Sequence, residues 1–205
     1  MKLLNLGCGG DRPQDEHWTN LDTLRTFLKP GTPERTNLDK ETNYVEWDLM
    51  EKLGVLFPGE PYDGILWQHG PEHFELHRAV TIAATCKDSL TPGGTLLVSA
   101  PDADYFMYAY PGDTRERAVE LFGEPISEPE HATFMDYALF HREHKQVLNP
   151  SGIMAILYRA GFKVGEVLEP YELVETPSRP TPAETIMSGR LNRRKFSAIL
   201  YARKP

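Results

Sequence analysis

The feature that most constrains the fold is a short apolar run, Leu3–Leu6, that passes directly into Gly7-Cys8-Gly9-Gly10. Such a run is typical of a buried strand that ends in a tight turn, because glycine adopts backbone conformations that other residues avoid. In open α/β sheets, ligands bind outside the carboxyl ends of the strands, which is where this turn lies. The sequence therefore predicts a ligand site at the end of the first strand.

Further apolar runs alternate with helical periodicity along the rest of the chain. Helices are predicted where apolar residues recur every three or four positions, over residues 76–90 and 153–160. Because strands and helices alternate, the fold class predicted is α/β, with no linker that divides residues 1–205 into two domains. The further strands are predicted at Trp18–Leu21, Tyr44–Trp47, Tyr62–Trp67, Thr95–Ala100, Phe162–Leu168 and Phe196–Ala202.

Two segments interrupt this alternation. Residues 24–42 are polar and contain Pro30, Gly31 and Pro33, so we expect a loop with one short helical piece at most. Residues 102–146 are rich in aromatic, histidine and charged residues. We expect them to form a partly helical insertion over the carboxyl edge of the sheet, on the substrate side.

The bulk composition restricts the partners and the location. The net charge is -8, and without a dense basic tract this argues against non-specific nucleic-acid binding. No apolar run approaches the roughly 18 residues of a membrane-spanning helix, and no signal peptide is evident. The two cysteines form no CxxC motif, which favours free thiols in a reducing compartment. We therefore expect a cytoplasmic protein whose partner is a small molecule.

The glycine turn excludes two common nucleotide sites. The dinucleotide fingerprint G-x-G-x-x-G fails because Arg12 stands at its third glycine, and no phosphate-binding G-x-x-x-x-G-K-[ST] loop is present. A ligand with a ribose and no phosphate fits better, and S-adenosylmethionine is such a ligand. Two acids that end successive strands add to this: Asp22 can accept from ribose hydroxyls, and Asp48 from an adenine amino group. Each could instead be a loop or cap residue, with Asp48 capping a helix from Leu49.

The sequence resembles the class I S-adenosylmethionine-dependent methyltransferases, and among them the methyltransferase type 11 family. The segments that carry the resemblance are Leu4-Asn5-Leu6-Gly7-Cys8-Gly9, Tyr62 through Glu72-His73-Phe74, Leu90-Thr91-Pro92-Gly93-Gly94-Thr95-Leu96 and Tyr158-Arg159-Ala160-Gly161-Phe162. The resemblance implies a Rossmann-like, mainly parallel sheet of seven strands in the order 3-2-1-4-5-7-6, with the last strand antiparallel and the insertion after strand 5.

The resemblance also implies a set of cofactor-binding residues. The glycine turn would contact the methionine part of the cofactor, Asp22 the ribose, and Asp48 with Leu49 the adenine. The full predicted set is Leu6, Gly7, Cys8, Gly9, Gly10, Asp22, Asp48, Leu49, Gln68 and His69. Asn5 departs from the family pattern, where an acid is common, and lacks the charge that would attract the methionine ammonium group.

Histidines supply the candidates for catalysis. Methyl transfer mainly requires alignment of the acceptor, and a general base helps when the acceptor is a hydroxyl or amine. His69 should lie at a strand tip, so it is the predicted catalytic base or acceptor contact; packing on the cofactor or capping the next helix is the alternative. Glu72 and His73 are interpreted as structural.

The insertion supplies the expected substrate contacts, Tyr105, His141 and His144. The two histidines are three residues apart and could bind a metal on a helix, but no third ligand is evident, so no metal is expected. The predicted function is methylation of a small molecule, a sugar or another metabolite, at oxygen or nitrogen. The alternatives are a non-catalytic binding module with this fold and a nicotinamide-dependent enzyme.

Overall fold

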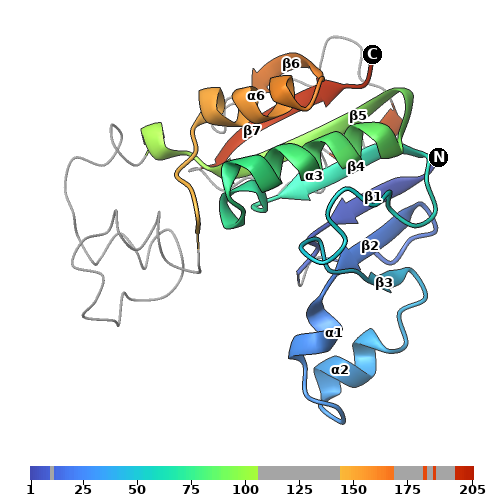
Figure 1. Cartoon of the computed structure of the whole chain (residues 1–205). Helices are drawn as coiled ribbons and strands as arrows, with labels where there is room; N and C mark the ends of the chain where they lie inside the picture. The colour runs from blue at the N-terminus through green and yellow to red at the C-terminus, as the bar shows by residue number, and fades with distance from the viewer. Residues whose placement is uncertain (10–11, 106–143, 169–181, 184–186, 188–196) are drawn as a thin grey trace, which may run out of the picture.

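The computed structural model describes residues 1–9, 12–105, 144–168, 182–183, 187 and 197–205 (Figure 1). Its strands are β1 (Leu3–Leu6), β2 (Trp18–Asp22), β3 (Tyr44–Glu46), β4 (Tyr62–Gln68), β5 (Leu90–Pro101), β6 (Lys163–Leu168) and β7 (Ser197–Arg203). Its helices are α1 (Leu24–Phe27), α2 (Pro33–Leu38), the 3-10 turn η1 (Pro71–His73), α3 (Leu76–Ser89) and α6 (Pro150–Arg159).

The strands form one sheet in the order β3-β2-β1-β4-β5-β7-β6. The pairs β1 with β2, β1 with β4, β2 with β3 and β4 with β5 are parallel, whereas β7 runs antiparallel to both β5 and β6. The predicted mainly parallel α/β sheet is therefore confirmed. Because the first four strands run the same way, their carboxyl ends lie along one edge of the sheet.

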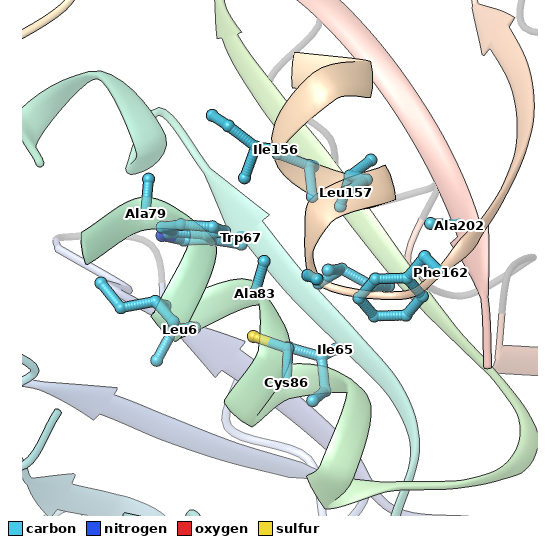
Figure 2. Packing of buried hydrophobic residues seen from close by; sticks show 14 of the residues in the cluster. Leu6, Ile65, Trp67, Ala79, Ala83, Cys86, Ile156, Leu157, Phe162 and Ala202 are labelled. Carbon is cyan, nitrogen blue, oxygen red and sulfur yellow. The ribbon is translucent and has the colours of Figure 1, made fainter. Parts of the chain in front are cut away.

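Helices α3 and α6 cover one face of the sheet (Figure 1). Side chains alternate between the two faces of a strand, so every second strand residue points toward these helices. Ile65 and Trp67 of β4 lie against Ala83 and Cys86 of α3 in the main apolar cluster (Figure 2). The predicted helical stripes are thus the buried faces of α3 and α6, and Gly161 ends α6 with a φ of 83°.

The opposite face has its own apolar cluster. It joins Leu3 of β1 and Leu66 of β4 to Ala183 and Met187 from the C-terminal part of the chain. The parallel strands are therefore buried on both faces, which explains why their sequences read as nearly continuous apolar runs. Among the residues that the structure describes, no helix is long and apolar enough to span a bilayer.

The structure corrects two details of the prediction. Residues 24–42 hold two short helices, α1 and α2, rather than one; Thr32 caps α2 by accepting from the backbone of Arg35 at 3.3 Å. Strand β5 begins at Leu90, the last residue of the predicted helix and five residues before the predicted strand start at Thr95. Its register with β4 shifts before pairing resumes at Thr95. Of the predicted insertion, only residues 102–105 and 144–146 lie within the described part of the chain.

Candidate functional site

A cavity of about 390 Å³ lies at the carboxyl ends of β1, β2, β3 and β4. Pockets of this size hold small metabolites and cofactors. Four neighbouring parallel strands contribute to it, as the rule for open α/β sheets predicts. Its lining consists of Gly7, Asp22, Thr23, Phe27, Trp47, Asp48, Leu49, Met50, Trp67, His69, Gly70, His73 and Phe74.

The glycine turn closes back onto β2. Gly7 and Gly9 have φ angles of 65° and 51°, in the left-handed region that glycine occupies without steric cost. The backbone N–H groups of Gly7 and Cys8 donate to the carbonyl oxygen of Leu21 at 2.8 and 3.4 Å. The turn is thereby fixed at the pocket wall without any side chain between it and a ligand.

Asp22 ties this turn to the end of β2. Its carboxylate accepts from the backbone N–H of Gly9 at 2.8 Å and from that of Thr23 at 2.6 Å. A carboxylate offers about four lone-pair positions, so two of them stay available to hydroxyl groups of a ligand in the pocket. Asp22 therefore combines a structural role with a place in the lining.

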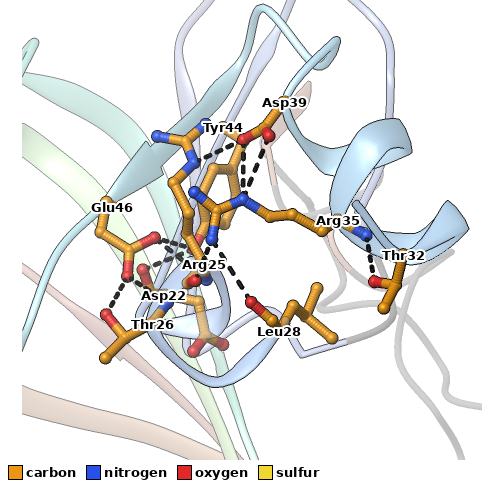
Figure 3. Close-up of polar contacts among 9 residues, drawn as sticks. All are labelled: Asp22, Arg25, Thr26, Leu28, Thr32, Arg35, Asp39, Tyr44 and Glu46. Carbon is orange, nitrogen blue, oxygen red and sulfur yellow. Dashed lines mark hydrogen bonds and ion pairs between the residues drawn. The ribbon is translucent and has the colours of Figure 1, made fainter. Parts of the chain in front are cut away.

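A polar network holds α1 beside Asp22 (Figure 3). The hydroxyl of Tyr44 lies 2.8 Å from the carbonyl oxygen of Asp22 and 2.7 Å from the carboxylate of Glu46. Burial, and then the bond to Glu46, raise the pKa of the Tyr44 hydroxyl, so it stays protonated at neutral pH. The guanidinium of Arg25 lies over the Tyr44 ring and pairs with Asp39 at 3.0 Å.

Asp48 lies in the lining and also caps a turn. Its Oδ1 accepts from the backbone N–H groups of Met50 at 2.7 Å and Glu51 at 3.1 Å. The helix that the sequence suggested from Leu49 is wrong, because residues 49–54 form turns. Leu49 lies in the lining next to Met50, which was not singled out from the sequence.

Aromatic side chains of the lining were missed. Phe27 is 78% exposed, and Trp47 packs against the main core with the ammonium group of Lys52 4.0 Å from its ring centre. The rings of Trp67 and Phe74, also in the lining, pack against each other with their centres 6.3 Å apart. The one signal available in the sequence was position, since Trp47 immediately precedes Asp48 and Trp67 ends the fourth apolar run.

His69 follows β4 directly and lies in the lining with a strained backbone. Its φ is 45°, unusual for a residue with a side chain, and such strain concentrates at functional sites. Its backbone N–H donates to the carbonyl of Ser99 at 2.9 Å. The ring lies between two groups: Nε2 is 2.9 Å from Oγ of Ser197, and Nδ1 is 3.5 Å from Oε1 of Glu72.

This serine, histidine and glutamate lie in the order seen in hydrolytic triads. Ser197 is fully buried, however, so its hydroxyl is inaccessible as a nucleophile. The serine hydroxyl can donate to Nε2, which leaves the ring proton on Nδ1, facing Glu72. The arrangement therefore orients the imidazole and does not form a serine hydrolase site.

Other predicted residues lie near the pocket but outside its lining. Leu6 is buried in the main core, and Cys8 packs with Leu38 and Tyr44, where burial raises the pKa of its thiol. Gly9 contacts the pocket through its bond to Asp22. Gln68 is half-buried at the end of β4.

The predicted substrate contacts are only partly described. Tyr105 is half-buried and does not line the cavity. His144 lies against His73, a pocket residue, with ring centres 4.8 Å apart. Gly10 and His141 lie outside the described residues.

Comparison with solved structures identifies methyltransferases with the same fold. A SAM-dependent methyltransferase from Archaeoglobus fulgidus matches with a TM-score of 0.52 and 18% identity, over 99% of this chain and 86% of that one. Another from Clostridium acetobutylicum matches with a TM-score of 0.57 and 8% identity, over 98% of this chain and 83% of that one. An O-methyltransferase family 2 protein from Planctomyces limnophilus, in complex with apigenin, matches with a TM-score of 0.53 and 14% identity.

The last match covers 99% of this chain but 49% of that protein, so this chain spans about half of its length. No family model matches the sequence, and no curated protein matches it either. At these identities the likeness establishes the fold that this chain shares with SAM-dependent methyltransferases.

Proposed function

We propose that this chain transfers a methyl group from S-adenosylmethionine to an oxygen or nitrogen atom of a small molecule. The observation that carries this proposal is the convergence of Gly7, Asp22, Asp48 and His69 on one cavity at the carboxyl edge of a methyltransferase-like sheet. These four residues come from the ends of four different strands. The resemblance to the type 11 family rests on the sequence segments alone and is part of the proposal.

The lining suggests how the cofactor binds. The glycine turn accommodates the methionine part, where bare backbone allows close approach. Asp22 accepts the ribose hydroxyls through its remaining lone pairs. Leu49 and Met50 pack on the adenine ring, and Asp48 accepts from its amino group.

The chemistry requires only alignment and a destination for one proton. A lone pair of the acceptor atom forms a bond to the methyl carbon, the carbon–sulfur bond breaks, and its electron pair stays on sulfur as a neutral thioether. A hydroxyl or amine acceptor also releases a proton. We propose His69 as the group that contacts the acceptor and takes this proton through Nε2, after Ser197 rotates its hydroxyl away.

The test is titration calorimetry with S-adenosylmethionine and with its demethylated product. We expect saturable binding of both at micromolar concentrations, with one site per chain. Absence of binding of either compound at millimolar concentration would refute the proposal. Turnover is then sought by following the labelled methyl group into a mixture of small-molecule acceptors.

One observation favours the alternative of a non-catalytic binding module. Both ring nitrogens of His69 already face protein groups, Ser197 and Glu72. Under this alternative the chain binds the cofactor and transfers no label to any acceptor in the mixture. Methyl transfer that depends on His69 would exclude it.

A further inference from the structure

Glu72, His73 and His144 bring three potential metal ligands together at the edge of the pocket. One ligand atom from each, a carboxylate oxygen or a ring nitrogen, lies within 4.8 Å of the other two. We propose that these residues bind a divalent transition-metal ion. From the sequence no metal is expected, because His141 and His144 lack a third ligand. In the structure two of the ligands come from η1 instead.

Backbone hydrogen bonds fix this juxtaposition across a long sequence separation. The N–H groups of Lys145 and Gln146 both donate to the carbonyl oxygen of Glu72, at 2.7 and 3.3 Å. The side-chain amide of Gln146 also donates to the carbonyl of Pro71, at 2.9 Å. These three bonds attach the chain that follows His144 to η1, so that His144 stays beside His73.

Glu72 is the residue that most requires a cation. It is 2% exposed, and within the described residues neither of its carboxylate oxygens has a hydrogen-bond partner. The ring nitrogen Nδ1 of His69, at 3.5 Å, is too distant for a strong bond. Burying a carboxylate without compensation costs several kcal/mol, roughly, and a bound cation offsets that cost.

The two histidines complete a ligand set with a defined metal preference. Their rings meet edge to face, at 79°, and both are half-buried. Two imidazoles and one carboxylate suit Zn²⁺, Mn²⁺, Fe²⁺ or Co²⁺ better than Mg²⁺, which prefers oxygen ligands alone. Bonds of about 2.0–2.2 Å hold two ligand atoms within about 4.4 Å of one another. The side chains would therefore rotate to close the present separations of up to 4.8 Å.

The surroundings of Glu72 also match a metal centre. Ligating groups are usually oriented by a further polar group, and Nδ1 of His69, 3.5 Å from Oε1 of Glu72, lies on the side where such a group would stand. Three protein ligands leave coordination positions open for water or a bound molecule, as in catalytic rather than structural sites.

The location gives the ion a role that rests on the proposed function. His73 lines the same cavity as His69, so the ion would border the acceptor side of the pocket. An ion there can bind the acceptor oxygen and lower the pKa of its hydroxyl, so that the proton leaves more readily before methyl transfer. This favours a hydroxyl-bearing acceptor able to bind a metal.

The test uses the whole chain, stripped with a chelator and titrated with Co²⁺ without S-adenosylmethionine. We expect one saturable equivalent, seen as visible d–d absorption without the intense bands of thiolate ligation. Glu72→Gln and His144→Ala should each raise the Kd at least tenfold. The matched control is His77→Ala. The His77 ring lies 3.5 Å from the carboxylate of Glu75, the same distance that separates His69 from Glu72. The side chains of His77 and Glu75 are 70% and 62% exposed, however, so this pair does not form a buried site. We expect the His77→Ala variant to bind like the wild type.

The metal site is overturned by a lack of saturable Co²⁺ binding to the wild-type chain, and also by unchanged binding in both variants. If circular dichroism shows that the variants do not fold, the metal site is tested in the wild-type chain by NMR of its histidine side chains. Substoichiometric Mn²⁺ should broaden the assigned imidazole signals of His73 and His144 before that of His77, and equal broadening of all three also overturns it. Cofactor binding by the metal-free chain reports separately on the proposed function.

Discussion

The side-chain amide of Asn5 donates to the side-chain carbonyl of Asn20 at 3.3 Å, across the paired strands β1 and β2. Both residues are buried, and the amide of Asn20 donates in turn to the carbonyl of Pro13 at 2.8 Å. Asn5 is not part of the pocket lining. The amide at this position therefore serves strand pairing in this chain, and a carboxylate there would face an oxygen atom.

Asn5→Asp should destabilise the protein although an acid is common here in the resembling family. A buried carboxylate opposite the Asn20 oxygen should cost about 3 kcal/mol of unfolding free energy at pH 7. Burial disfavours the charged form of the new carboxyl group, so this group loses its proton at a lower pH in the unfolded chain than in the folded chain. The loss of unfolding free energy relative to the wild type should therefore grow as the pH rises above about 4. Urea unfolding measures both effects. Asn37→Asp, on the exposed surface of α2, is the control and should change stability little.

Asp22→Ala should weaken cofactor binding. The substitution removes the acceptor for the Gly9 and Thr23 backbone groups and for the proposed ribose hydroxyls. Hydrogen bonds to a charged group contribute about 1.5–3 kcal/mol each, so we expect the Kd for S-adenosylmethionine to rise roughly 10- to 100-fold. Calorimetry provides the Kd. Asp63→Ala removes another acid, which bonds to the backbone of Lys2, and should leave the Kd unchanged. Equal affinities for both variants would contradict the assignment of Asp22.

His69→Ala should separate catalysis from cofactor binding. If His69 contacts the acceptor, turnover should fall about 100-fold or more while the Kd for the cofactor changes little. Ser197→Ala should alter kcat by less than His69→Ala does, because its two effects oppose each other. It frees Nε2 of His69 for the acceptor, but it also removes the hydrogen bond that orients the ring. Both are measured with an acceptor found in the labelled-methyl screen, with His77→Ala as the exposed control. Full turnover by His69→Ala would show that the residue only packs in the pocket.

The parts of the site that follow from strand ends could be predicted from the sequence. Gly7, Asp22, Asp48 and His69 each follow an apolar run, and parallel strands place such ends along one edge. The pairing of His144 with His73 could not be predicted, because the two residues are far apart in the sequence and no periodicity links them. Sequence periodicity assigns residues to a face or an edge, whereas contacts between distant loops depend on tertiary packing.

The same limit applies to the fold. Buried apolar runs predicted the strands well, since burial on both faces leaves a strong signal. The short helices α1 and α2 were underestimated because four to six residues carry too little periodicity to be recognised. From the sequence, Asn5 was noted only as a departure from the family pattern, because its amide partner, Asn20, is visible only once β1 and β2 pair.

Gly70→Ala should disrupt the pocket through steric conflict. A Cβ atom at this position would lie 2.0 Å from Nε1 and 2.5 Å from Cδ1 of Trp67, a side chain that is 1% exposed and unable to move aside. We expect a loss of about 3 kcal/mol in unfolding free energy, at the upper end for an overpacked site. Gly93→Ala meets no atom within 4 Å and should lose only about 1 kcal/mol from its φ of 76°. Equal losses in urea unfolding would contradict the conflict with Trp67.

Cys86 should make the protein less stable as the pH rises above about 8.5, the ordinary pKa of a free thiol. Burial raises the pKa of the Cys86 thiol in the folded chain, so only the unfolded chain releases this proton in that range. The unfolded state then binds fewer protons, and the free energy of unfolding falls by up to about 1.4 kcal/mol per pH unit for this thiol. Cys86→Ala removes the titration, so its deficit relative to the wild type, measured by urea unfolding, should shrink between pH 8 and pH 10. Ile82→Val, a buried change on the same helix without a titrating group, should give a deficit that is constant with pH. A constant deficit for both variants would mean that Cys86 ionises alike in the folded and unfolded chains.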